Sequence, residues 1–330
     1  QGLFCSLLIG TIIKTLGQQL NLPFMVEMGG FASAMAAPAM AIAIGYALKA
    51  PPLVLFSLAA VGQAANTMGG SGGPLAVFFI AIIAAEIGKA ISKETKVDIL
   101  VTPFVTISAG EVVSYAIAPP IGAVANAFGT LINHTTALQP FWMGIAVSVL
   151  VGIALTLPIS SAAICHTFGL VGLAGGAAVA GCCAQMVGFA VMSFKENRWG
   201  GIVSQGLGTS MLQMGNIVRN PRIWIPPTLA SAVTGPIATC VFKLQMNGAP
   251  VNSGMGTCGL CGPIGVWTGW VAPSEKAVEM INAVAISPSS MDWIGLLLIA
   301  IVLPAVLTLL FAWPLRKMGW IKDGDLKLDL

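Results

Sequence analysis

The stretch GMGTCGLCGPIGVW, Gly254–Trp267, decides the fold because it repeats an earlier stretch, MGGSGGPLAVF, Met68–Phe78. When Pro263 is aligned with Pro74, the glycines and the apolar residues of the two stretches fall into register. Apolar segments interrupted by glycine and proline in both halves of a chain are typical of inverted-repeat transporters. We therefore predict two broken or re-entrant helices, whose free backbone groups must bind protein, water or solute. The backbone positions of interest are Gly70, Gly73, Gly259 and Gly262.

The composition is that of a protein dissolved in lipid. Of the 330 residues, 56% are hydrophobic and only 8% are charged, whereas a soluble domain carries about 25% charged residues. Apolar runs of about 20 residues, enough to cross a bilayer as a helix, recur along the chain. We predict an all-α polytopic protein of the plasma (inner) membrane, in contact with lipid, with about eight to ten transmembrane helices.

The alignment of the two Gly-rich stretches also places Pro38 on Pro227, which supports a duplication. We predict a single integral membrane domain made of two inverted repeats. Its parts are repeat 1 at residues 1–118, connecting helices at 119–195, repeat 2 at 196–316 and a cytoplasmic tail at 317–330.

Loop charges indicate the orientation. Lysine and arginine favour cytoplasmic loops, and the loop of Lys89, Lys93 and Lys96 has a counterpart in repeat 2 that contains neither residue. This asymmetry favours inversion and a cytoplasmic C-terminus. If residue 118 lies outside the membrane and Lys195 lies on the cytoplasmic side, the chain between them must cross the membrane an odd number of times. Either a third helix crosses at residues 121–134, or residues 155–169 are re-entrant.

Cys258 and Cys261 form a Cys-x-x-Cys that could bind a soft metal or cycle as a disulfide. A closed zinc site takes four ligands, and no second cysteine or histidine pair has the spacing to supply them. The aligned residues, Gly69 and Gly72, favour a requirement for small residues instead. We expect no metal and no cofactor, and a net charge of only +3 favours no nucleic-acid partner.

Polar residues within the apolar sequence are candidates for binding a small polar solute. Amides and hydroxyls suit a hydroxyl-rich ligand, and each suits interhelical hydrogen bonding equally well. Glu111 is either a functional carboxylate or one that lies near an interface or pairs with a backbone donor. For His166 a structural role is favoured over a coupling role. No catalytic residue is predicted, because GxxxxGK[ST], G-x-S-x-G and HExxH motifs are all missing. The candidate substrate-binding residues are Asn66, Thr67, Ser71, Glu111, Ser160, Ser161, His166, Gln213, Asn216 and Asn252.

Three longer runs carry a resemblance to a known family. They are TPFVTISAGEVVSYAIAPP from Thr102, PFWMGIAVSVLVGIALTLPISS from Pro140 and NPRIWIPPTLASAVTGPI from Asn220. The chain resembles enzyme IIC, the membrane subunit of sugar phosphotransferase systems, of fructose-like type. Two segments, LFCSLLIGTIIKTLG near the start and GLCGPIG, most resemble sequences of the family branch that includes the perfringolysin regulator.

The resemblance implies a homodimer in which a substrate domain moves past an interface domain. An external sugar would be carried inward and phosphorylated with a partner, enzyme IIB, so the chain has no autonomous active site. Two departures bear on this function. Residues 158–163 lack the glycines, asparagine and lysine of a GGPxNKAA-like segment, and residues 209–213 have no acid where the family usually has a sugar-binding glutamate.

Two functions follow. The first is a permease of the enzyme IIC type, which moves a sugar or another small polar solute by alternating access within a phosphoenolpyruvate-dependent phosphotransferase system. The second is a membrane-embedded sensor or regulator of the perfringolysin-regulator type, which kept the fold and lost phosphorylation coupling. The missing acid favours the second, because Gln213 offers only neutral hydrogen bonds to a sugar. The preserved broken helices favour the first.

Overall fold

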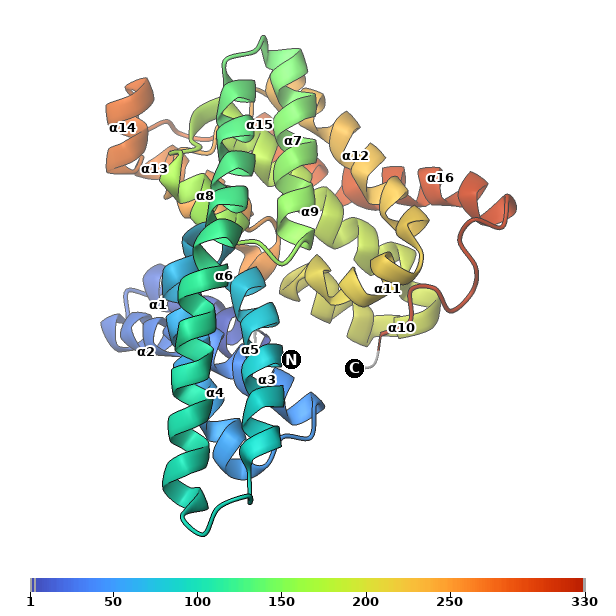
Figure 1. Ribbon diagram of the computed structural model, residues 1–330. Coiled ribbons are helices and arrows are strands. Elements are labelled where there is room, and N and C mark those ends of the chain that lie inside the picture. The colour runs from blue at the N-terminus through green and yellow to red at the C-terminus, as the bar shows by residue number, and fades with distance from the viewer. Residues whose placement is uncertain (1, 3, 329–330) are drawn as a thin grey trace. The chain divides into compact units, whose positions relative to one another are not determined.

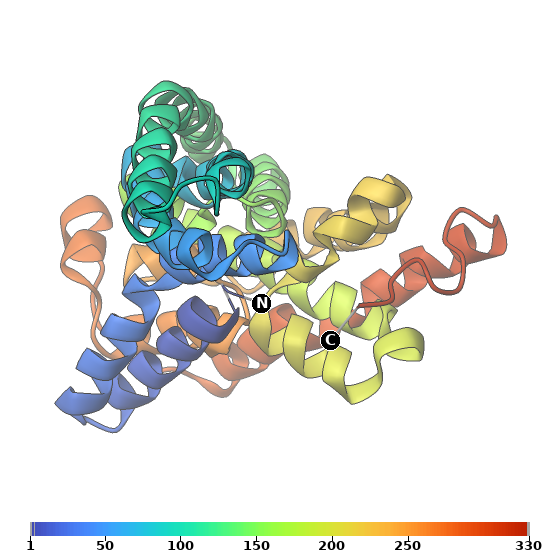
Figure 2. The same ribbon diagram turned by 60° about the horizontal axis from the view of Figure 1, so that its bottom comes forward.

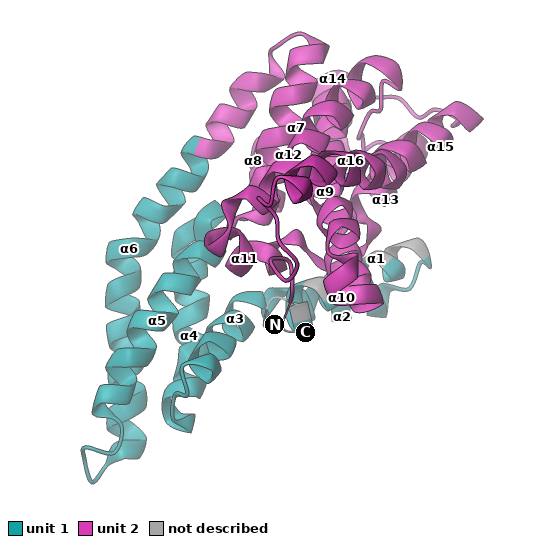
Figure 3. Ribbon diagram, turned by 90° about the vertical axis from the view of Figure 1, so that its right-hand side faces the viewer, with its two compact units in different colours: residues 1–127 teal, residues 128–330 magenta. Residues whose placement is uncertain are grey.

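The computed structural model describes residues 2 and 4–328 and shows a helical protein (Figures 1 and 2). Within these residues there is no strand, and one antiparallel β-bridge joins Gly172 to Met246. The predicted all-α polytopic class is confirmed. The chain divides into two compact units, residues 1–127 and 128–330 (Figure 3). The repeat boundaries stay a prediction, and residues 1 and 3 of repeat 1 and 329–330 of the tail lie outside the described residues.

The first unit consists of helices joined by short turns. Prolines begin several of them, because a proline in the first turn of a helix removes an N–H that has no partner there. Small residues let three of the helices pack closely around a core in which Leu58 and Ile80 are fully buried. The elements are a π-helical segment (Phe4–Leu8), α1 (Ile9–Gln19), α2 (Pro23–Ala34), α3 (Ala36–Ala47), α4 (Pro52–Gly69), α5 (Gly73–Ile91) and α6 (Asp98–Thr136), which continues into the second unit.

The first predicted break separates α4 from α5. A 3₁₀ turn, Gly70–Gly72, lies between the two helices, and Gly70 has φ +50° and ψ −122°, a backbone conformation that favours glycine strongly. A Cβ on Gly73 would lie 2.9 Å from the carbonyl oxygen of Asn66, so the close approach of the end of α4 requires glycine there as well. The helices α4 and α5 then pack against each other.

The second unit holds the remaining helices. Short 3₁₀ and π-helical segments interrupt them at several points. The helices are α7 (Pro140–Thr156), α8 (Ser161–Thr167), α9 (Gly172–Met192), α10 (Phe194–Gly201), α11 (Met214–Arg219), α12 (Ile225–Pro236), α13 (Cys261–Val271), α14 (Glu275–Ile281), α15 (Ser290–Leu297) and α16 (Leu303–Lys317).

The centre of the second unit is α9, which is buried along nearly its whole length. Its sequence, GLAGGAAVAGCCAQMVGFAVM, is rich in small residues that let other helices approach closely. A Cβ on Gly181 would overlap the carbonyl oxygen of Ser148 in α7. The helices α7, α12 and α16 all pack against α9, and Ser148 donates a 2.8 Å hydrogen bond to the carbonyl of Ser231 in α12. Close packing and interhelical hydrogen bonds therefore hold this bundle together.

Like the first break, the second is a 3₁₀ turn that precedes a helix, but its backbone differs. Gly70 has ψ −122°, whereas Gly259 has ψ +21° and is followed by a left-handed Leu260. A 3₁₀ turn, Cys258–Leu260, precedes α13, and Gly259 has φ +52°, close to the value for its aligned partner Gly70. The chain that leads into the two breaks differs. The first break follows the 18-residue α4, whereas the second follows a loop and a short 3₁₀ segment, Pro250–Gly254.

Among the described residues, four helical stretches are long and apolar enough to cross a membrane, and a fifth is added if α2 and α3 form one bent span. This number is lower than the eight to ten predicted crossings. One stretch, Pro52–Ile91, contains both α4 and α5, and other apolar runs fold as shorter helices such as α7 and α12.

In the region between the predicted repeats, residues 121–134 form no separate helix. Residues 121–134 continue α6, whose 39 residues extend over about 58 Å at 1.5 Å per residue. Residues 155–169 contain the end of α7, a break and the short α8.

Candidate functional site

A cavity of about 740 Å³ opens at the N-terminal end of α9. Its walls come from the chain just before α9, the loop after α12 and the turn after α14, all within the second unit. Polar side chains and a tryptophan lie among apolar ones, which is the usual composition of a small-molecule site. We call it the α9 cavity, and its lining includes Asn133, Lys243, Gln245, Asn247, Trp270 and Asn282.

The β-bridge holds two walls of the α9 cavity together. The N–H of Gly172 donates to the carbonyl of Met246 and the N–H of Met246 donates back, each at 3.0 Å. Gly172 has φ +63°, which glycine adopts without steric cost. Nearby, Ser253 donates a 2.6 Å hydrogen bond to the carbonyl of Leu170. The loop after α12 is thus tied to the start of α9 at two points.

Asn247 is the buried polar residue of the α9 cavity, with only 5% of its surface exposed. Its Nδ2 donates to Oε1 of Gln245 at 3.1 Å, and its backbone carbonyl accepts from the N–H of Ser274 at 2.8 Å. Its Oδ1 is buried and has no hydrogen-bond partner among the described residues. An unpartnered buried acceptor costs about 1–3 kcal/mol. This oxygen has almost no accessible surface, so a solute in the α9 cavity reaches it only if the Asn247 side chain turns toward the cavity.

A second polar group, which we call the amide cluster, lies at the C-terminal end of α9 and consists of Gln205, Gln213 and Asn216. Gln213 Nε2 donates to Gln205 Oε1 at 2.9 Å, and Asn216 Nδ2 donates to Gln213 Oε1 at 2.8 Å. Gln205 Nε2 reaches Ser193, the residue that ends α9, at 2.7 Å. All three amides are buried. The structure therefore brings together the predicted residues Gln213 and Asn216 and adds Gln205.

A third polar group lies part-way along α9, around the fully buried Gln185. Its Oε1 accepts from Trp224 Nε1 at 2.9 Å and from Thr156 Oγ1 at 3.3 Å. Thr156 also lies 2.8 Å from the hydroxyl of Ser210, three residues before Gln213. Neutral polar groups therefore occur at the start, the middle and the end of α9. Because α9 has 21 residues and a helix rises 1.5 Å per residue, its two ends are about 30 Å apart.

The predicted residues of the first unit do not form one cluster. Asn66 lies beside Gly73 at the break, and Ser71 is buried in the 3₁₀ turn. Thr67 donates to the carbonyl of Gln63 in its own helix, and Glu111 is exposed on α6. No hydrogen bond joins any two of these four residues in the described part of the chain. A shared binding role for them stays a prediction.

The predicted residues around α8 have local contacts. Ser160 caps α8 by accepting from the N–H of Ala163 at 3.2 Å. Ser161 donates to the carbonyl of Gly254 at 2.7 Å, so α8 is joined to the 3₁₀ segment that contains Asn252. His166 is exposed in the last turn of α8. The hydroxyls of Ser160 and Ser161 thus contact backbone groups, which is the structural alternative for polar residues in a membrane.

The Cys-x-x-Cys stretch lies in the second break. The Sγ of Cys261 lies 3.9 Å from the carbonyl oxygen of Gly259 and donates to it. A Cβ on Gly262 would lie 2.6 Å from the carbonyl oxygen of Gly256. The turn is therefore closely packed, which agrees with the requirement for small residues at these positions.

Sequence reasoning missed Gln185, Gln205 and Asn247. A signal for the first was present, because a glutamine in the middle of the apolar run AGCCAQMVGFA must find hydrogen-bond partners inside the protein. The role of Asn247 had no such signal, since its environment depends on contacts with residues distant in the chain.

Comparison with known proteins supplies the decisive observation for the family. The family model described as "Phosphotransferase system, EIIC" matches residues 1–328. The chain belongs to the enzyme IIC family. This enzyme IIC protein is accordingly a multi-pass plasma-membrane component of sugar transport, and its family works with an enzyme IIB partner. No curated protein and no solved structure matches the chain significantly.

Proposed function

We propose that this enzyme IIC protein is a sugar permease that works by alternating access and that the α9 cavity is its outer solute site. The observation that carries the proposal is the buried, unpartnered Oδ1 of Asn247 in a cavity of about 740 Å³. A sugar hydroxyl would donate to this oxygen once the Asn247 side chain turns toward the cavity, and Trp270 and the apolar lining would contact the faces of the sugar ring.

A route for the solute is supported by the polar groups along α9. They are separated by about 30 Å, which is close to the thickness of the hydrocarbon core. Gln185 lies between the α9 cavity and the amide cluster, so a sugar would exchange one set of neutral hydrogen bonds for the next. Such bonds are weak enough to be broken during transport and strong enough to prefer hydroxyls over apolar molecules.

The orientation follows from charge. Lys195, Arg316 and Lys317 lie at the amide-cluster end of α9 or in helices that end beside it, and basic residues favour the cytoplasmic side. The C-terminus would then be cytoplasmic and the α9 cavity would face outside. Enzyme IIB would dock on the cytoplasmic loops at Lys89–Lys96 and Lys195–Arg198, and the protein would act as a homodimer.

The test is uptake by the purified full-length protein in liposomes. Radiolabelled fructose and mannitol should enter these vesicles faster than protein-free vesicles, and excess unlabelled sugar should abolish the difference. A sugar that raises the melting temperature and never enters would contradict transport and favour the sensor. Failure of every sugar to bind or enter would contradict the sugar permease.

A further inference from the structure

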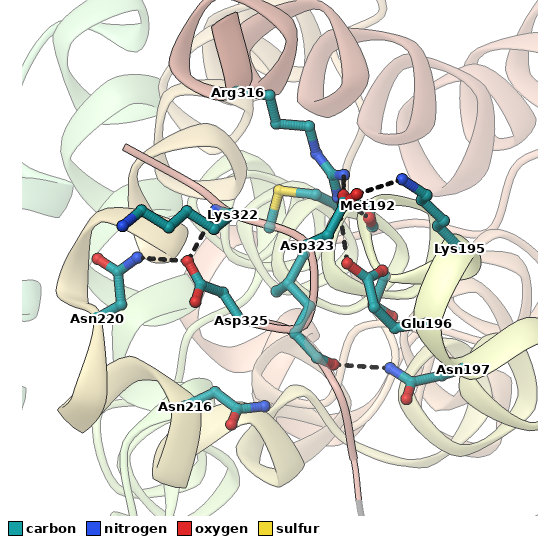
Figure 4. Close-up of polar contacts among 12 residues, drawn as sticks. Met192, Lys195, Glu196, Asn197, Asn216, Asn220, Arg316, Lys322, Asp323 and Asp325 are labelled. Carbon is teal, nitrogen blue, oxygen red and sulfur yellow. Dashed lines mark hydrogen bonds and ion pairs between the residues drawn. The ribbon is translucent and has the colours of Figure 1, made fainter. Parts of the chain in front are cut away.

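The C-terminal tail, Lys322–Leu328, returns to the amide cluster after α16 has ended (Figure 4). A single apolar side chain anchors it: Leu326 is fully buried in a cluster with Phe189 and Ile217. Its neighbours Lys322, Asp323, Gly324 and Lys327 are exposed. A segment with one buried anchor and exposed flanks opens at much lower cost than a core helix.

The tail binds the amide cluster through its backbone. The carbonyl of Leu326 accepts from Gln213 Nε2 at 3.0 Å and from Asn197 Nδ2 at 2.8 Å. The carbonyl of Lys327 accepts from Asn216 Nδ2 at 2.9 Å. Asn197 also accepts from the N–H of Leu328 at 2.9 Å. Two of the three amide-cluster residues therefore use a side-chain N–H on a tail carbonyl.

Charged residues hold the tail at its other end, as Figure 4 shows. Lys195 pairs with Asp323 at 2.5 Å, and Arg316 lies 3.6 Å from Asp323 and 3.9 Å from the buried Glu196. If the tail leaves, Arg316 loses Asp323 but keeps Glu196 as a counter-charge. The arginine thus has an acidic neighbour in both states, which lowers the cost of release.

The side-chain amide donors of Gln213 and Asn216 determine which other ligands could bind in place of the tail. A sugar hydroxyl oxygen accepts an amide N–H as a peptide carbonyl does. We propose that the tail is an internal ligand that covers a hydroxyl-binding site formed by Gln213 and Asn216 at the inner end of the solute route. This inference rests on the proposed function, and it makes the tail a gate that competes with the solute.

Competition of this kind has a measurable size. The apparent dissociation constant of a ligand equals the intrinsic one divided by the fraction of time for which its site is uncovered. A tail that covers the site for nine-tenths of the time weakens sugar binding about tenfold. Release of the tail should therefore increase the apparent sugar affinity by the same factor.

Two full-length variants release the tail without changing Gln213 or Asn216. Leu326→Asp places a charge on the buried anchor, and Asn197→Ala removes the second donor to the Leu326 carbonyl together with the acceptor for Leu328. Lys322→Ala is the matched control, because this side chain is exposed and its change leaves the tail backbone in place. The fluorescent probe is a synthetic peptide with the sequence of Lys322–Leu328.

The peptide should bind Leu326→Asp, which keeps every partner of the peptide, much more strongly than it binds the wild type or Lys322→Ala. Asn197→Ala lacks two of the peptide's own contacts and is tested by its sugar affinity alone. Fructose or mannitol should displace it from Leu326→Asp, and Gln213→Ala added to Leu326→Asp should abolish that displacement. Each release variant should bind the sugar about tenfold more tightly than wild type does. A peptide that does not bind, or that no sugar displaces, would overturn the inference.

The outcomes separate the two proposals. Sugar uptake by the wild type without displacement of the peptide leaves the permease standing and removes the tail as a gate. Displacement of the peptide in a protein that never transports sugar keeps the covered site and removes the permease.

Discussion

The substitution Asn247→Leu separates a solute-binding amide from a structural one. In the free protein, the buried Oδ1 of Asn247 has no partner among the described residues, and such an acceptor costs about 1–3 kcal/mol. Leucine has a similar size and removes this cost. It also removes the hydrogen bond to Gln245, which is worth about 0.5–1.5 kcal/mol. We expect the free energy of unfolding to increase by about 1 kcal/mol.

Solute binding should change in the opposite direction. Loss of one neutral hydrogen bond of about 0.5–1.5 kcal/mol weakens affinity about twofold to tenfold. The assay pairs equilibrium unfolding of the full-length protein in detergent with titration of fructose or mannitol. A gain in stability with a loss of affinity is the signature of a residue placed for a ligand.

The matched control is Gln205→Leu. Gln205 is also a buried amide, but its donor and acceptor both have protein partners. Its replacement should lower the free energy of unfolding by about 1–3 kcal/mol, because partners are left unsatisfied. If Asn247→Leu destabilises the protein as much as Gln205→Leu does, Asn247 is a structural amide and the assignment of the α9 cavity is wrong.

Three further predictions concern the break, the cysteines and the tail. Gly262→Ala should lower the free energy of unfolding by about 1–3 kcal/mol, because the new Cβ would overlap the carbonyl oxygen of Gly256. The control is Gly215→Ala, where nothing lies within 4 Å of the new Cβ. It should be neutral or slightly stabilising in the same unfolding assay. Replacing Cys258 and Cys261 by alanine should leave folding and sugar affinity nearly unchanged. If elemental analysis found a bound metal in the wild type that this double variant lacks, the packing role of the two cysteines would be contradicted. The hydrogen bond from Lys195 and its positive charge lower the pKa of Asp323 below 3.8. Because the folded-state pKa is the lower one, tail docking should be constant above about pH 4 and weaken as the pH falls through that lowered pKa. Peptide-binding titrations should show this loss, and Asp323→Asn should remove the pH dependence.

Much of the fold could be predicted, because apolar runs and helix breaks depend on local sequence. The alignment of two Gly-Pro motifs located both turns, and Gly70 and Gly259 both have positive φ, although their ψ values differ. The described residues contain fewer long apolar helices than the eight to ten crossings predicted, because an apolar run does not show where it breaks. Residues 223–242, for example, form a 3₁₀ turn, α12 and a π-helical segment rather than one span.

The candidate site could be predicted only in part. Gln213 and Asn216 were found because polar residues are rare in this chain, and the structure brings them together. The α9 cavity was not found, because the bridge between Gly172 and Met246 joins segments far apart in sequence. The tail contacts were missed for the same reason, since the Gln213 amide meets a backbone carbonyl more than 100 residues later. No sequence pattern marks a carbonyl for such a bond.

The most direct test of the α9 cavity as the outer solute site is cysteine labelling of its lining. Asn133→Cys, in full-length protein with the exposed Cys5 and Cys240 replaced by alanine, presents one thiol at the cavity. A membrane-impermeant maleimide should label it only from outside the cell, and saturating fructose or mannitol, whichever is transported, should slow the labelling. Labelling only from the cytoplasmic side, or at a rate that no transported sugar changes, would contradict the account.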